Sequence, residues 1–159
     1  MRYKFLTGSI VFLLAAFANG QTVQVIPSIN IDQNTLYYEI YVQTTEGQEV
    51  ELGNSVFEVT YNKEKLTYLG KELGMDGLWD DGNSSDYHDT YSTSIEDRAI
   101  FRILYKVGDG LMVPTTEAAR VGCMIFQVDG EYSPDDIKWM DPFCIVSDIH
   151  EQKLIVDLQ

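Results

Sequence analysis

Apolar and polar residues alternate along much of this chain with a period of two, which is typical of half-buried β-strands. The clearest run is residues 35–44, where alternate positions form an apolar face of Leu36, Tyr38, Ile40 and Val42. The opposite face carries Tyr37, Glu39, Tyr41 and Gln43. Residues 54–62, 98–107 and 120–128 alternate in the same way, and shorter strands are predicted for 22–31, 65–73, 137–140, 143–148 and 153–159.

Turn-forming residues separate these runs, as in Val-Gly-Asp-Gly at 107–110 and Met-Asp-Pro at 140–142. Only residues 114–120 could form a single helical turn, and no internal repeat or linker divides the chain. Short alternating strands with regular turns predict one all-β domain, an antiparallel β-sandwich.

The first 20 residues have the layout of a secretory signal peptide. Arg2 and Lys4 precede a mostly apolar run, and Ala18-Asn19-Gly20 resembles a cleavage site. The run is shorter than the about 20 apolar residues of a membrane span, although an uncleaved anchor is the alternative. We therefore expect a signal peptide at 1–20 and a secreted or cell-surface domain at 21–159, with no membrane span after cleavage.

The chain is strongly acidic, with 25 Asp and Glu against 11 Lys and Arg and a formal charge of −14. Such a surface repels the phosphates of nucleic acids and anionic lipids, so nucleic-acid binding is excluded. This acidity is compatible with the binding of calcium, with the binding of neutral polysaccharide, or with a role in solubility alone.

Two cysteines, Cys123 and Cys144, are present. In a secreted domain an even pair favours a disulfide, and both residues fall on outward strand faces by alternation. We expect a Cys123–Cys144 disulfide if their strands are neighbours; two separate buried thiols are the alternative.

Residues 37–70 and 113–128 resemble the cohesin-like domains of secreted Bacteroidetes-type proteins. The similar features are the aromatic alternating strand, a Leu52-Gly53-Asn54 turn, Tyr61-Asn62 before Leu66, and Arg120-Val121-Gly122. The resemblance implies a jelly-roll-like sandwich of about nine strands. The same superfamily includes cellulose-binding modules, so the resemblance also implies a module that binds dockerins or polysaccharides, or a surface module of unknown ligand.

The stretch LWDDGNSSDYHDTYSTS, residues 78–94, is the main candidate for a site in a loop. Calcium prefers six to eight oxygen ligands, and carboxylates of this type supply them. The candidate ligands for a structural calcium are Asp76, Asp80, Asp81, Asp86 and Asp89. The register does not match an EF-hand, and Asp, Asn, Gly and Ser are the usual residues of solvated loops, which favours an ordinary loop.

Aromatic residues suggest two alternative binding sites. Trp79, Tyr87 and Tyr91 could hold a sugar or a protein partner in the loop, although Trp79 could instead fold inward as a lid. The second candidate is an outward strip of Tyr37 and Tyr41 with Ile100, Leu104 and Ile125. The alternative is that loops cover this strip, so that it forms a second half of the core.

Catalysis has little support, because His88 and His150 are the only histidines and no nucleophile, zinc or phosphate-binding motif is present. The sequence therefore predicts a non-enzymatic module that binds polysaccharide or a surface protein. The alternative is a structural subunit of an extracellular matrix or filament, in which exposed sheet edges or the terminal strands, 22–31 and 153–159, pair between copies.

Overall fold

The computed structural model of this chain describes residues 21–45, 49–72 and 87–159, and of residues 88–91 it describes the backbone alone. The described part contains eleven strands and one short 3₁₀ helix, η1 (Pro134–Asp136). The strands are β1 (Thr22–Asp32), β2 (Thr35–Thr44), β3 (Val50–Tyr61), β4 (Leu66–Glu72), β5 (Tyr87–Ile95), β6 (Arg98–Tyr105), β7 (Leu111–Val113), β8 (Ala119–Val128), β9 (Ile137–Trp139), β10 (Ile145–Asp148) and β11 (Ile155–Leu158).

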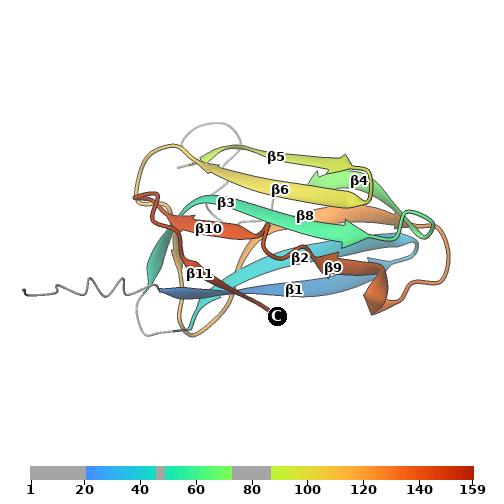
Figure 1. Cartoon of the computed structure of the whole chain (residues 1–159), viewed down its shortest axis with the longest axis horizontal. Helices are drawn as coiled ribbons and strands as arrows, with labels where there is room; N and C mark the ends of the chain where they lie inside the picture. Colours follow the sequence, from blue (N-terminus) through green and yellow to red (C-terminus); the bar gives the residue numbers. More distant parts are fainter. Residues whose placement is uncertain (1–20, 46–48, 73–86) are drawn as a thin grey trace, which may run out of the picture.

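These strands form two sheets packed face to face (Figure 1). The five-stranded sheet has the order β11-β1-β2-β8-β4, and all its pairs are antiparallel except β1 with β11. The six-stranded sheet follows β10-β3-β6-β5, and β7 and β9 also pair with β3. The predicted antiparallel sandwich is confirmed, with eleven described strands instead of about nine.

The core lies between the sheets, on the faces that the alternation predicted. Leu36, Ile40 and Val42 of β2 have no exposed surface, and Phe57 of β3 is equally buried. Aromatic rings join the layers, since the Tyr61 and Phe126 ring centroids are 5.1 Å apart at an interplanar angle of 61°. Period-two alternation therefore located the inner face of β2.

Two glycines permit close approach where a side chain would not fit. A Cβ on Gly122 of β8 would lie 2.7 Å and 2.8 Å from the Cε atoms of Phe101, across the core. A Cβ on Gly53 would lie 2.9 Å from the backbone nitrogen of Ile149 and closer still to Asp148. Leu52-Gly53-Asn54 is thus a segment of β3 beside β10, and the prediction of a turn there was wrong.

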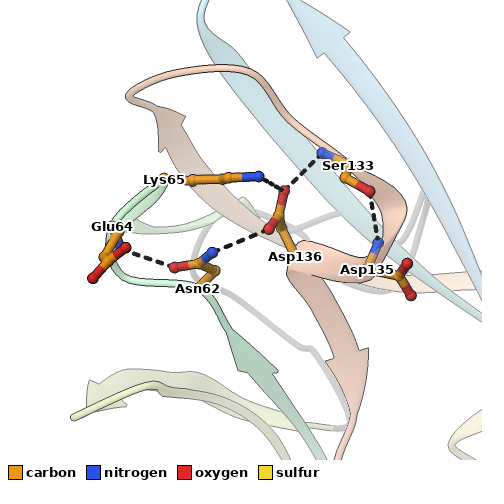
Figure 2. A network of polar contacts seen from close by, with 6 residues as sticks. All are labelled: Asn62, Glu64, Lys65, Ser133, Asp135 and Asp136. Atoms are coloured by element: carbon orange, nitrogen blue, oxygen red, sulfur yellow. Dashed lines mark hydrogen bonds and ion pairs between the residues drawn. The ribbon is translucent and has the colours of Figure 1, made fainter.

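The turn between β3 and β4 is fixed to η1 by the buried carboxylate of Asp136 (Figure 2). Asn62 Nδ2 donates to Asp136 Oδ1 at 3.1 Å, and Lys65 Nζ donates to Oδ2 at 3.0 Å. The Ser133 backbone N–H also donates to Oδ2, at 2.7 Å. Burial alone would raise the pKa of Asp136, but these hydrogen bonds and the Lys65 charge together lower it. Because donors already pair with both oxygens, the network acts as a structural brace.

Candidate functional site: two opposite sheet faces

The acidic loop falls largely outside the described residues. Asp76, Trp79, Asp80, Asp81 and Asp86 all lie there. The backbones of Asp89 and Tyr91 belong to β5, and their side chains are outside the described part. Residues 87–94 are therefore strand, and their prediction as loop was wrong. The stretch is mostly polar, so it shows no alternation of apolar and polar residues.

Tyr87 is part of the core and is not an exposed ring. It is 2 % exposed, and its hydroxyl donates to the Leu52 carbonyl and accepts from the Leu111 N–H, each at 2.6 Å. Its ring packs edge-on against Tyr105 at 5.9 Å. Tyr87 therefore joins β5, β3 and β7, which corrects its assignment as a ligand-binding residue.

The predicted Cys123–Cys144 disulfide is also wrong, because both cysteines are free and buried. Cys123 lies opposite Glu39 in the five-stranded sheet. Cys144 lies beside the six-stranded sheet, with its Sγ 3.5 Å from the Glu58 nitrogen. Alternation predicted the outward face for Cys123. The disulfide prediction also required the strands of Cys123 and Cys144 to be neighbours, and that adjacency was only assumed. Burial raises the pKa of Cys123 to about 12 and that of Cys144 to about 11.

The predicted outward strip is divided between the two opposite faces of the sandwich. Tyr37 and Ile125 are register partners in the five-stranded sheet. Ile100 and Leu104 belong to β6 of the six-stranded sheet, where Ile100 is only 6 % exposed. Alternation shows on which side of its own strand a residue lies, but not which sheet the strand joins.

The outer face of the six-stranded sheet carries an exposed apolar patch, here called the β3–β6–β10 face and defined by Val56, Leu104 and Ile145. Ile145 and Arg102 flank Val56 on its two neighbouring strands. Leu104 is 40 % exposed and Ile145 is 39 % exposed. A shallow depression of about 220 Å³ opens here. It is lined by the three residues of the face and by Asn54, Ser55, Ile103, Ser147, Glu151 and Lys153.

Charged groups border this patch. Arg98 Nη1 lies 3.1 Å from Glu58 Oε1, and Glu58 is almost fully covered although it points outward. Asn54 Oδ1 accepts from the Tyr105 N–H at 2.9 Å, which fixes the end of β6 beside the depression. The arrangement is an apolar centre with a polar rim, as in many protein–protein interfaces.

The outer face of the five-stranded sheet is more polar. Arg120 Nε lies 2.9 Å from Glu39 Oε1, and its Nη2 lies 3.9 Å from Glu72. This cluster lies over the Cys123 thiol, whose pKa responds to all three charges. Tyr41 donates to Glu39 Oε2 at 3.4 Å, so Tyr37 and Tyr41 flank a charged cluster instead of forming a continuous aromatic strip.

Val56 and Ile145 were not among the candidate site residues that the sequence suggested. Ile145 alternates with the buried Val146, so an outward position was already visible in the pattern. What the pattern lacked was the pairing of β10 with β3, which places Ile145 beside Val56.

The part of the chain that the structure describes contains no candidate metal site and no membrane-spanning helix. Within it, no three His, Cys, Asp or Glu side chains are grouped so that they could hold a metal ion. No helix among the same residues is long and apolar enough to span a bilayer.

Comparison of the sequence with protein-family models and with curated proteins finds no match. Solved structures do match, with TM-scores of 0.59 in each of the following three cases. The sixth cohesin of Acetivibrio cellulolyticus scaffoldin B, in complex with a dockerin, is 10 % identical over 88 % of this chain and 94 % of that chain. A type I cohesin in a cohesin–dockerin complex from Clostridium thermocellum is 13 % identical over 86 % and 94 %. The type II cohesin A11 from Bacteroides cellulosolvens is 12 % identical over 86 % and 95 %.

These structures share the sandwich over nearly their whole length, at identities that carry information on fold alone. The cohesin-like fold expected from the resemblance is confirmed, and the structure of this chain is a cohesin-like β-sandwich.

Proposed function

We propose that this protein is a secreted, non-catalytic module that binds a protein partner through the β3–β6–β10 face. The observation that carries the proposal is the exposure of Leu104 and Ile145 on one sheet face, where they line the same depression with a polar rim. Soluble domains rarely leave a contiguous apolar surface open unless another molecule covers it.

The shape of the face favours a protein over a small molecule. The depression holds about 220 Å³, whereas small-molecule sites usually enclose about 300–1,000 Å³. Full burial of a large aliphatic side chain stabilises by about 1.5–3 kcal/mol. Completing the burial of Leu104 and Ile145 would therefore contribute about 1 kcal/mol each, while Arg102 and Lys153 at the rim would select the partner.

The cohesin-like fold supports this choice, because two of the similar structures are cohesins bound to dockerins. The signal-peptide pattern at 1–20, which lies outside the described residues, supports export to the cell exterior. Mass spectrometry of the protein recovered from its native culture tests the export: a mature chain beginning at Gln21 is expected.

Matched substitutions test the face. Leu104→Asp introduces a charge at the centre of the β3–β6–β10 face, and Leu69→Asp makes the same change at a position on β4 that is 56 % exposed. Wild-type protein serves as bait for extracellular proteins of the same culture, and the captured partner is then titrated by calorimetry. We expect Leu104→Asp to weaken binding at least tenfold and Leu69→Asp to change it less than threefold. Equal binding by both variants would reject the face.

Polysaccharide binding is the second candidate, supported by the outward Tyr37 and Tyr41 beside Glu39. Affinity electrophoresis in soluble glucans, xylans and mannans tests it. Retardation that Tyr37→Ala and Tyr41→Ala remove, and that Leu104→Asp leaves intact, would assign a glycan site to the five-stranded sheet.

The other alternative is assembly of copies through their terminal strands, and the pairing of β1 with β11 counts against it. β1 and β11 pair with each other within one chain, over Thr22–Val25 and Ile155–Leu158, so this pairing is not free to join copies.

A further inference from the structure

β1 has an edge that the described strands leave open along part of its length. β2 pairs with β1 from Val23 to Asp32, whereas β11 covers only Thr22–Val25 on the other side. We call residues 26–32 on that side the β1 open edge. No described strand pairs with it, and a row of unpaired backbone groups at a sheet edge is a template for another strand.

The backbone direction along this edge follows from two hydrogen bonds. Ile155 N donates to the Gln21 carbonyl at 3.0 Å, and Gln159 N donates to the Val25 carbonyl at 3.1 Å. Odd-numbered residues of β1 therefore direct their backbone groups away from β2. By the same alternation Ile29 and Ile31 present N–H and C=O groups at the open edge, whereas Pro27 presents only a carbonyl.

The side chains of this edge are apolar and unusually exposed for their position. Ile29 lies opposite Tyr38, and Ile31 lies opposite Leu36, so both isoleucines are on the inner face of the sheet. Tyr38 and Leu36 are buried, but Ile29 is 39 % exposed and Ile31 is 43 % exposed. The six-stranded sheet contacts Tyr38 through Trp139, at a ring-centroid distance of 5.2 Å, and leaves this corner of the inner face uncovered.

Acidic side chains lie at both ends of the open edge. Asp32 is exposed at the end of β1. Asp157 and Asp141 line a cavity of about 250 Å³ together with Leu158, at the end of β11 where the open edge begins. Among the described residues, no Lys or Arg forms an ion pair with any of these three carboxylates.

We infer that the β1 open edge binds an extended segment of a partner protein in which apolar residues alternate with Lys or Arg. The segment adds a strand to the five-stranded sheet: its backbone pairs with Ile29 and Ile31, and its apolar side chains cover those isoleucines. Its basic residues face Asp32 at one end and Asp157 and Asp141 at the other. A second copy is a poor occupant, because each chain carries a formal charge of −14.

This edge is distinct from the β3–β6–β10 face, so the two proposals fail separately. The probe is an acetylated and amidated peptide, KVKVKVKVK, labelled for fluorescence anisotropy. The control peptide KPKPKPKPK has the same charge but lacks every second N–H and cannot pair as a strand. We expect the first peptide to bind at least tenfold more tightly than the second.

Two matched variants locate the binding. Ile29→Lys places a charge on the inner side of the edge, and Asn30→Lys places the same charge one residue along, on the outer side. We expect Ile29→Lys to weaken peptide binding at least tenfold and Asn30→Lys less than threefold, with both variants shown to be folded by circular dichroism. Leu104→Asp, on the other sheet, should leave peptide binding unchanged.

A measurement on the unmodified protein tests the proposal even if a variant fails to fold. Amide hydrogen exchange at Ile29 and Ile31 should slow at least tenfold when the valine peptide is saturating. Equal affinity for the two peptides, or unchanged exchange at both amides, would overturn the proposal. Concentration-dependent dimerisation that Ile29→Lys abolishes would assign the edge to a second copy and overturn it as well.

Discussion

Gly122→Ala tests the contact between the sheets. The added Cβ would lie 2.7 Å and 2.8 Å from two ring carbons of Phe101, whereas carbon atoms pack at about 3.5–4.0 Å. The Phe101 ring must therefore shift by about 1 Å. It has no exposed surface and packs against Phe57 at a centroid distance of 6.4 Å, so it has no free space to enter. Overpacking of this kind lowers the free energy of unfolding by about 1–3 kcal/mol.

Urea unfolding followed by fluorescence measures the effect. A loss of about 2 kcal/mol with a slope of about 2 kcal/mol per molar lowers the urea midpoint by about 1 M. Gly130→Ala is the matched control, because a Cβ there meets nothing within 4 Å. It should change the free energy of unfolding by less than about 0.5 kcal/mol. If Gly122→Ala unfolds at the wild-type midpoint, the close packing of Phe101 on β8 is refuted.

A double-mutant cycle makes the same test specific to one contact. Phe101→Leu removes ring atoms and should destabilise the protein on its own, but it also makes room for the new methyl group. We expect the double variant Gly122→Ala/Phe101→Leu to be at least about 1 kcal/mol more stable than the sum of the single changes predicts. Simple additivity would mean that the two positions do not touch.

Three further predictions concern the thiols, the buried carboxylate and the acidic loop. Because burial raises the pKa of Cys123 to about 12 and that of Cys144 to about 11, both thiols should resist Ellman's reagent in the folded protein and react in urea; a reductant-sensitive urea midpoint would contradict this. Burial raises the pKa of Asp136, but its hydrogen bonds lower this pKa by a larger amount. The folded pKa of Asp136 therefore lies below its unfolded value. The stability that Asp136 adds is therefore present above about pH 4 and is lost as the pH falls through the folded pKa. Asp136→Asn should show a smaller difference in urea midpoint between pH 7 and pH 3 than the wild type, and an equal difference would count against the brace. A solvated acidic loop predicts equal thermal midpoints in calcium and in chelator, whereas a rise in calcium that Asp80→Asn/Asp81→Asn removes would assign an ion site instead.

Long strands were predictable from the sequence because their alternation is strong. The apolar face of β2 was identified correctly, since one face of the strand must be buried. β5 was missed because His88-Asp89-Thr90-Tyr91-Ser92 carries no apolar alternation. Its position comes from pairing with β6 and from the anchored hydroxyl of Tyr87, both of which are non-local.

Local pattern determined the fold class, most of the strands and the inward side of β2, because these depend on neighbours two residues apart; β5 and β7 were not predicted from it. Strand order was decided only in the folded chain, because it depends on contacts between segments far apart in sequence. For that reason the sequence placed Cys123 and Cys144 on outward faces but could not show that Cys123 lies in the five-stranded sheet and Cys144 beside the six-stranded sheet. The same limit applies to Val56, Leu104 and Ile145, which meet on one face only because β3 lies between β6 and β10.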